Sequence, residues 1–152
     1  CKVFNSTYID RKILNIMQKN SRITVKQIAE ECFISSPSVS VRLQNLEGLG
    51  YIRTYQAILD HQKLGFLIKA YVNCAVNAKD KQDFYRYIEE IPNVVECDCI
   101  TGDYSMLLKV YFTNTIELDE FITDLQRFGD TKTHIVFSTN VGPRGLQIQI
   151  NE

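Results

Sequence analysis

The stretch from Ile23 to Ile52 holds two short amphipathic segments on either side of a tight turn, and it constrains the fold more than any other part of the chain. Thr24 can cap the first segment, and Gln27, three residues later, can complete a capping box. Thr7 and Asp10 have the same spacing, so a further helix is expected to begin after Thr7. Apolar residues recur at helical spacing in all three segments. The pattern therefore predicts three helices that contain a helix-turn-helix.

The last of these helices is expected to begin at Pro37 and to end at Gly50. Proline suits the first helical position because its missing N–H needs no partner there. Its ring also favours an extended conformation at Ser36, which makes Ser36 the expected N-cap. Residues 51–53 are then expected to form a short strand that begins a small wing. The expected inward stripe of the helix is Val39, Leu43, Leu46 and Leu49.

The outward face of the same helix is rich in Ser, Gln and Asn. A face that is merely solvated usually carries Lys and Glu, which are stronger helix formers. Ser, Gln and Asn side chains can donate hydrogen bonds to base edges and accept hydrogen bonds from them. This composition favours a helix that reads double-stranded DNA in the major groove over a packing bundle with a solvated face.

Basic residues around this helix are candidates for contacts with DNA phosphates. Residues 1–60 carry eight Lys or Arg against five Asp or Glu, whereas residues 61–152 carry nine against thirteen, so the basic excess lies in the half with the helix-turn-helix. Arg42 lies beside the buried stripe, and its position allows either of two roles: a contact with a DNA phosphate or an ion pair within the domain. The candidate DNA-contacting residues are Arg22, Lys26, Ser35, Ser36, Ser38, Ser40, Arg42, Gln44, Asn45 and Arg53.

Composition and the remaining motifs argue against an enzyme, a membrane protein or a metalloprotein. The chain has 152 residues, 45% of them hydrophobic, yet it has no apolar run long enough to span a membrane and no signal-peptide pattern at the N-terminus. The five cysteines include no Cys-x-x-Cys pair, and no phosphate-binding or dinucleotide-binding glycine loop occurs. His61 and His134 lack a recognisable catalytic partner in the sequence. We therefore expect a cytoplasmic protein with no cofactor, no metal site and no membrane partner.

The second half of the chain changes from helical to alternating periodicity. Its pattern predicts the order strand, helix, strand, strand, helix, strand, which is the βαββαβ arrangement of ferredoxin-like domains. The expected strands are residues 67–76, 94–101, 104–112 and 131–139, and the expected helices are residues 79–91 and 116–128. The fold class is therefore α+β, with a winged helix-turn-helix domain at 1–53, a linker at 54–66 and a ferredoxin-like αβ-sandwich domain at 67–152.

Two helices can cover only one face of a four-stranded sheet, so the other face needs a partner. The residues expected on that second face are too apolar for contact with water. The simplest partner is the same face of a second subunit, so we expect a homodimer. The expected set is Leu67, Tyr71, Ile100, Leu107, Tyr111, Ile135 and Phe137.

Over essentially its whole length the chain resembles the Lrp/AsnC family, the leucine-responsive regulatory protein and asparagine-synthesis regulator group of bacterial and archaeal transcription factors. The matching residues include Asn20-Ser21-Arg22-Ile23 before the helix-turn-helix, Gly102-Asp103-Tyr104 between two expected strands, and Leu107-Leu108-Lys109 in the next strand. The resemblance implies a DNA-binding regulator that pairs through its sheets, assembles further into a tetramer of dimers, and responds to amino acids bound between dimers. An effector-independent architectural protein that organises DNA is the alternative.

The same resemblance implies a small-molecule effector site around the Gly-Asp-aromatic loop and the last strand. Ser105 departs from the family pattern, which commonly has a second Asp at this position. A carboxylate there would pair with the ammonium group of an amino acid, and a charge-assisted bond of that kind contributes about 1.5–3 kcal/mol. We therefore expect a preference weaker than, or different from, that for a plain amino acid. The implied effector-site residues are Thr101, Gly102, Asp103, Tyr104, Ser105, His134, Val136 and Ser138.

Overall fold

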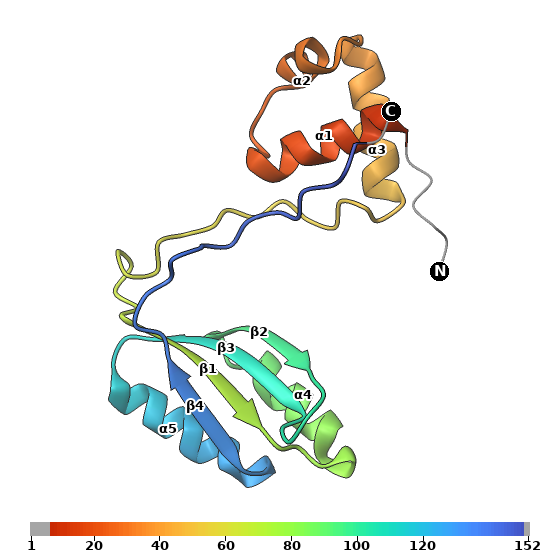
Figure 1. Cartoon of the computed structure of the whole chain (residues 1–152). Helices are drawn as coiled ribbons and strands as arrows, with labels where there is room; N and C mark the ends of the chain where they lie inside the picture. The colour runs from red at the N-terminus through yellow and green to blue at the C-terminus, as the bar shows by residue number, and fades with distance from the viewer. Residues whose placement is uncertain (1–6, 151–152) are drawn as a thin grey trace. The chain divides into compact units, whose positions relative to one another are not determined.

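The computed structural model of this chain describes residues 7–150, so the outer limits expected for the two domains, residues 1 and 152, lie outside the described residues. The chain divides into two compact units, whose helices and strands are labelled in Figure 1. The first unit takes the chain up to Ala57 together with the part from Val141 onwards, and the second unit is Ile58–Asn140. By its contacts, the segment from residue 141 groups with the N-terminal unit.

The first unit is built on three helices, α1 (Tyr8–Lys19), α2 (Val25–Cys32) and α3 (Ser36–Gly48). Both expected capping boxes are present. Thr7 and Asp10 exchange hydrogen bonds at the start of α1, and Thr24 and Gln27 do so at the start of α2. These caps satisfy N–H groups that have no partner within the helix. The predicted helix-turn-helix is confirmed.

Helix α3 begins one residue earlier than expected. Ser35 Oγ accepts a hydrogen bond from the Ser38 N–H at 3.3 Å, which makes Ser35 the N-cap. Ser36 is thus the first helical residue and Pro37 the second, so the expectation of a cap at Ser36 was wrong. Either of two successive serines before a proline has the chemistry of a cap, and the sequence alone does not separate them.

The end of α3 also differs from the expectation, because no wing follows it. Gly50 adopts φ +78°, a left-handed conformation that suits glycine. The N–H groups of Tyr51 and Ile52 then turn back to the carbonyl of Leu46, at 2.9 and 3.1 Å. The strand expected at residues 51–53 is therefore absent, since its first donors cap the helix instead. Leu49, expected to face inward, is 73% exposed on this turn.

The hydrophobic core of the first unit lies between its three helices. Ile13 and Val39 are fully buried at its centre, and Leu46 is buried beside them. Ile148, from the C-terminal segment, packs against the same core. The C-terminal end of the chain therefore contributes to the hydrophobic core of the first unit.

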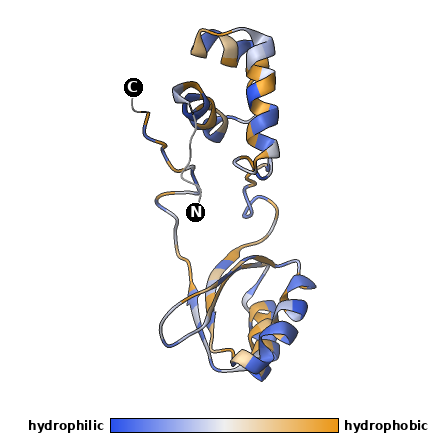
Figure 2. Cartoon of the chain, turned by 90° about the vertical axis from the view of Figure 1, so that its right-hand side faces the viewer, coloured by the Kyte–Doolittle hydropathy of each residue, from blue (hydrophilic) through white to orange (hydrophobic). Residues whose placement is uncertain are grey.

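The second unit is a four-stranded antiparallel sheet with two helices on one face, as Figure 1 and Figure 2 show. Its strands are β1 (Ile68–Cys74), β2 (Val94–Cys99), β3 (Met106–Phe112) and β4 (Thr131–Ile135), in the sheet order β2-β3-β1-β4. Its helices are α4 (Lys81–Glu89) and α5 (Thr115–Leu125), with 3₁₀ turns at Ala78–Asp80 and Gln126–Phe128. The predicted βαββαβ order is confirmed.

Alternation along the strands divides the sheet into two faces. In β1, the side chains of Ala70, Val72 and Cys74 are fully buried on the face that the helices cover. Phe84 of α4 and Leu125 of α5 are fully buried in the same core. The alternate residues of β1 and β3, which lie between the buried ones, point to the other side of the sheet.

We call that other side the open face, and Tyr71, Leu107 and Tyr111 lie at its centre, each of them partly buried. Charged residues also point to this face: Lys69, Lys109 and Lys132 from β1, β3 and β4, and Glu96 and Asp98 from β2. Lys109 lies between Leu107 and Tyr111, directly opposite Tyr71. The ring of His61, from the segment before β1, stacks on Tyr111 with ring centroids 3.8 Å apart. The open face thus combines aromatic and aliphatic side chains with charges of both signs.

Two residues expected on the open face do not lie there. Ile135 pairs with Ala70, whose side chain faces the helices, so Ile135 points to the helix-covered side. His134 pairs with Tyr71 and takes the open-face position in β4. Phe137 follows the end of β4 and is fully exposed. The sequence misassigned the two sides of β4 because successive residues at its end are apolar, which leaves the alternation ambiguous.

Candidate nucleic-acid interface and effector loop

Helix α3 presents an outward face of short polar side chains. Gln44 and Asn45 are exposed in its second half, while Ser38 and Ser40 are partly buried in its first half. A shallow hollow on this face is lined by Pro37, Ser38, Val41, Arg42 and Asn45. Groups that donate and accept hydrogen bonds are therefore gathered along one side of α3, interrupted by the apolar surface of Pro37 and Val41.

The first turn of α3 carries the other two serine candidates. Ser35 uses its Oγ as an acceptor for the Ser38 N–H, and its hydroxyl hydrogen can still be donated outward. Ser36 is partly buried at the first helical position. A helix N-terminus of this kind offers backbone N–H groups and the positive end of the helix dipole, which favour a phosphate oxygen nearby.

Arg42 is held inside the first unit. Its Nη1 donates hydrogen bonds to Asp10 Oδ1 at 2.8 Å and to Thr7 Oγ1 at 2.9 Å. Burial acts to raise the pKa of the Asp10 carboxyl, but the hydrogen bonds from Arg42 and Thr7, together with the charge of Arg42, lower that pKa overall. Of the two roles open from the sequence, the structure forms the ion pair, and Arg42 thereby joins α3 to the start of α1.

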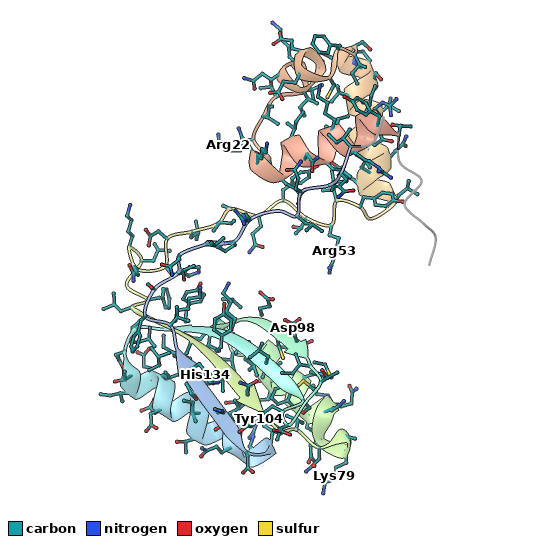
Figure 3. All side chains as sticks on the ribbon, viewed as in Figure 1. Arg22, Arg53, Lys79, Asp98, Tyr104 and His134 are labelled. Atoms are coloured by element: carbon teal, nitrogen blue, oxygen red, sulfur yellow. The ribbon has the colours of Figure 1, made fainter. Side chains whose placement is uncertain are left out.

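The three remaining basic candidates are exposed. Arg22 follows α1, and its N–H donates to Asn20 Oδ1 at 3.0 Å. Lys26 is in the first turn of α2, and Arg53 follows α3. Figure 3 shows the side chains of Arg22 and Arg53 projecting outward from the first unit. These positions suit contacts with phosphates on either side of a groove.

The turn between α2 and α3 carries an exposed aromatic residue that sequence reasoning missed. Phe33 ends α2 with φ +56°, a left-handed conformation, and its side chain is 90% exposed. Lys12 Nζ lies 5.5 Å from the centroid of the Phe33 ring and donates a hydrogen bond to the Glu31 carbonyl. The signal that could have drawn attention to Phe33 is its position: the residue that ends a helix in a left-handed conformation is usually Gly or Asn.

The Gly-Asp-aromatic loop joins β2 to β3 at one end of the sheet. Gly102 adopts φ +107°, which a residue with a side chain rarely adopts, so the turn depends on glycine. Thr101 and Asp103 are exposed, and Tyr104, labelled in Figure 3, is partly buried. The loop therefore offers a carboxylate, a hydroxyl and an aromatic ring on a short, tightly turned backbone.

Ser105 faces the interior of the second unit rather than the loop surface. Its Oγ accepts the Val76 N–H at 2.8 Å and donates to the Val76 carbonyl at 3.0 Å. Its own carbonyl accepts the Ile100 N–H at 2.8 Å, which closes the hairpin. The side chain of Ser105 is thus committed to fixing the segment that follows β1.

His134, Val136 and Ser138 lie elsewhere on the sheet. The start of β3, which follows the loop, pairs with Cys74, whereas the Val136 N–H donates at 2.8 Å to the carbonyl of Lys69, five residues earlier in β1. At about 3.3 Å per residue, the separation along the strand is roughly 17 Å. Within one chain, the expected effector residues therefore form two groups at different levels of the sheet.

A helix-turn-helix with a polar reading face, joined in one chain to an α+β domain, defines the class of DNA-binding transcriptional regulators with a ligand-binding domain. Family models agree. A winged helix-turn-helix DNA-binding family matches residues 6–53, and the Lrp/AsnC ligand binding domain matches residues 69–145. The chain belongs to the Lrp/AsnC family of transcriptional regulators.

Known relatives support the assignment over nearly the full chain. The HTH-type transcriptional regulator LrpC of Bacillus subtilis is 31% identical over 86% of this chain and 90% of its own, and LrpA of the same organism is 33% identical over 84% and 95%. The solved structure of B. subtilis LrpC aligns with a TM-score of 0.83 at 30% identity, covering 89% of this chain and 96% of that one. A Neisseria meningitidis transcriptional regulator solved in complex with L-Met shares the fold, with a TM-score of 0.84 at 24% identity, covering 94% of this chain and 96% of that one.

These matches decide between the broad functions weighed from the sequence. The relatives are transcriptional regulators, so this chain is a DNA-binding regulator and not an enzyme. The match to a ligand-binding domain supports modulation by an effector and disfavours the effector-independent alternative. In the part of the chain that the structure describes, no helix is both long and apolar enough to cross a lipid bilayer.

Proposed function

We propose that this regulator binds operator DNA as a homodimer, with the α3 helix of each subunit in one of two successive major grooves about 34 Å apart. The observation that carries the proposal is the outward face of α3, where Gln44 and Asn45 are exposed beside a hollow that includes Ser38. The open face of the sheet, with its aromatic and aliphatic side chains, supports pairing of the subunits. A tetramer of such dimers is the further assembly that we expect.

Specificity and affinity come from different residues in this proposal. Base edges are contacted by the polar side chains of α3, and phosphates are contacted by exposed cations and by the first turn of α3. Arg42 acts indirectly, by holding α3 against Asp10. The proposed base-contacting residues are Ser36, Ser38, Ser40, Gln44 and Asn45, and the proposed phosphate-contacting residues are Arg22, Lys26, Ser35 and Arg53.

Replacing both Gln44 and Asn45 with Ala is expected to abolish sequence preference and to leave weak, salt-sensitive binding. The reason is that each good contact with a base edge contributes about 1–3 kcal/mol of discrimination, whereas phosphate contacts contribute to every sequence alike. The measurement compares dissociation constants for a duplex selected with the wild-type protein and for a scrambled duplex, at several salt concentrations.

A matched control removes an exposed amide elsewhere, with Gln82→Ala on α4. This variant is expected to keep the wild-type preference. Replacing Lys26 with Ala should weaken binding to both duplexes equally and reduce the slope of log K against log salt by about one. An unchanged preference in the Gln44/Asn45 double variant would contradict the base-reading role.

For the effector, we propose a site that residues of more than one subunit complete. The loop around Gly102 and the group around Val136 are roughly 17 Å apart along the sheet of one chain, so a single small molecule does not span both. The backbone N–H groups of the loop can meet a carboxylate, and Asp103 supplies the one charged side chain between Thr101 and Ser105. Ser105 carries no charge and its hydroxyl is bonded to the Val76 backbone, so an amino acid lacks a second anionic partner for its ammonium group here.

Calorimetry with L-methionine and the other amino acids tests this site. We expect weak binding, and we expect Asp103→Ala to reduce it further, at least several-fold, because a charge-assisted hydrogen bond is lost. Asp119→Ala, on the exposed surface of α5, is the control and should leave binding unchanged. Tight binding of one amino acid that persists in the Asp103→Ala variant would show that Asp103 is not its partner and that Ser105 imposes no penalty.

A further inference from the structure

The C-terminal segment lies along helix α1, where the side chain of Asn15 is bonded to its backbone. Asn15 Nδ2 donates to the Ile148 carbonyl at 2.8 Å, and Asn15 Oδ1 accepts the Ile148 N–H at 2.9 Å. Asn15 is 7% exposed and is the one buried polar residue among residues 7–150. A buried amide whose donor and acceptor are both used in this way is costly to leave unpaired, so this contact fixes the segment in one register.

Two further side chains of the same helix extend the contact in both directions. Gln18 Nε2 donates to the Leu146 carbonyl at 2.8 Å, and Arg11 Nη1 donates to the Gln149 carbonyl at 3.2 Å. Arg11, Asn15 and Gln18 are spaced four and three residues apart, which places them on one side of α1. The side chain of Ile148 packs on the core of the first unit between these polar contacts. We call residues 145–149 the strap.

The strap approaches α1 so closely that one of its positions requires glycine. A Cβ atom at Gly145 would lie 2.2 Å from Gln18 Oε1 and 2.7 Å from Gln18 Cβ, both shorter than any real contact. A Cβ atom at Gly142, three residues earlier, would meet no atom within 4 Å. The docked position therefore depends on Gly145, and Gly142 provides a matched position in the same segment that does not.

The chain that leads into the strap is a second covalent connection between the two units. Thr139 belongs to the second unit, where Lys69 Nζ donates to its Oγ1 at 3.1 Å. Gly145 is only six residues further along the chain, and six residues span at most about 22 Å when fully extended. The expected effector residues Val136 and Ser138 lie just before this span. A short length of chain therefore joins that region of the second unit to the residues that contact α1.

Helix α1 passes the connection on to the reading helix. Asp10 Oδ1, in the first turn of α1, lies 2.8 Å from Nη1 of Arg42 in α3. The strap, α1 and α3 therefore form one continuous set of contacts, from the end of the chain to the proposed DNA-reading face. Either the loss of the strap or the loss of the ion pair would break it.

We propose that residues 145–149 are a strap through which the ligand-binding domain restrains the DNA-reading helix. The proposal rests on the proposed function, because its consequence is for DNA. With the strap docked, each helix-turn-helix has fewer orientations available, so a dimer loses less freedom when it binds two half-sites together. Release of the strap weakens binding to paired half-sites and leaves binding to a single half-site unchanged.

The test compares full-length Gly145→Leu with full-length Gly142→Leu. Backbone hydrogen exchange at Ile148 reports docking, because its N–H donates to Asn15. DNA binding is measured with a duplex selected from a random pool by the wild-type protein, and with one half of that duplex. We expect Gly145→Leu to lose protection at Ile148 and to bind the two-site duplex about tenfold more weakly, a difference of about 1.4 kcal/mol. Gly142→Leu should match the wild-type protein in all three measurements.

Three results would overturn the inference. Ile148 could stay protected in Gly145→Leu, which would show that the strap does not depend on the close approach. Two-site binding could be unchanged while protection is lost, which would show that the strap does not restrain α3. Both duplexes could lose affinity equally, which would show that the strap only stabilises the first unit. A wild-type protein that binds no duplex would instead contradict the proposed function, and exchange at Ile148 would still decide whether the strap is docked.

Discussion

Replacing Tyr111 with Glu is expected to disrupt the proposed dimer and to leave a folded monomer at micromolar concentration. Tyr111 lies at the centre of the open face, opposite Lys69 of the neighbouring strand. In a dimer that pairs through this face, a carboxylate at this position is taken out of water without a partner from the other subunit. Breaking or burying a charge in this way costs about 3–5 kcal/mol, which corresponds to at least a hundredfold weaker association.

The monomer itself should tolerate the change, since Tyr111 is only partly buried and a Glu side chain there stays in contact with water when the open face is uncovered. The change does remove the stacking of His61 on the Tyr111 ring. His61→Ala removes the same stacking without adding a charge and is expected to remain dimeric. Ile116→Glu, at a position on α5 that is 70% exposed, adds a carboxylate away from the open face and should also remain dimeric.

Light scattering and sedimentation across a concentration series provide the measurement. A wild-type protein that is a well-folded monomer at micromolar concentration would end the proposal of pairing through the open face. So would a Tyr111→Glu variant that dimerises as tightly as the wild type. Either result would leave the half-buried state of Tyr71 and Leu107 without a functional reason.

Much of the fold could be predicted from the sequence because local chemistry and burial agree over most of the chain. The boxes at Thr7 and Thr24 each consist of two residues with one fixed spacing, so they mark helix starts without reference to the rest of the molecule. In β1, strict alternation of Ala70, Val72 and Cys74 identifies the buried face by itself. Where one local signal sufficed, the expectation was met.

The errors fall where two local choices are equivalent. Ser35 and Ser36 have the same side chain before the same proline, so only the backbone conformation decides which of them caps α3. Ile135 was placed on the wrong face because the next two residues, Val136 and Phe137, are apolar too, and the pairing of Ile135 with Ala70 is a long-range contact. The expected wing failed at Tyr51 for a related reason: its N–H had a closer acceptor at the end of α3.

The contacts of the C-terminal segment were beyond sequence reasoning for a different cause. Asn15 looks like an ordinary polar residue of α1, and its partner Ile148 is 133 positions away. Residues 141–150 form no helix or strand, so no periodicity in the sequence indicates where they pack. Ser105 is similar, since its hydroxyl is turned towards Val76 by the fold of the second unit and not by any neighbour in sequence. Long-range pairing of polar side chains with backbone is the information that a single sequence does not carry.

Replacing Arg42 with Met is expected to lower the free energy of unfolding of the first unit by about 2–3 kcal/mol at neutral pH. The change leaves the carboxylate of Asp10 without its ion-pair partner while keeping most of the apolar stem of residue 42. The estimate lies below the value for a fully buried pair because the two side chains remain 29% and 18% exposed. Urea denaturation at pH 7, followed by a signal from the helices, measures the loss.

The pH dependence gives the same interaction a second signature. The pKa of Asp10 is lowered in the folded protein, so the stability that Asp10 contributes is present above its unfolded pKa of about 4 and is lost as the pH falls through its lower folded pKa. The difference in stability between the wild type and Arg42→Met should therefore shrink as the pH is lowered below about 4. Asp10→Asn should show the same loss at pH 7, and a double variant should show less than the sum of the two.

An exposed ion pair elsewhere in the chain supplies the control. On α4, Arg86 Nη1 lies 3.6 Å from Asp83 Oδ1, and the two side chains are 78% and 72% exposed. Water screens such a pair, so Arg86→Met is expected to change stability by less than about 0.5 kcal/mol. An Arg42→Met variant that is as stable as the wild type, yet binds DNA less tightly and with a shallower slope of log K against log salt, would support the other role that the sequence left open for Arg42, a direct contact with phosphate. Loss of stability with an unchanged salt slope for the folded variant would establish that Arg42 serves DNA binding only by holding α3 against α1.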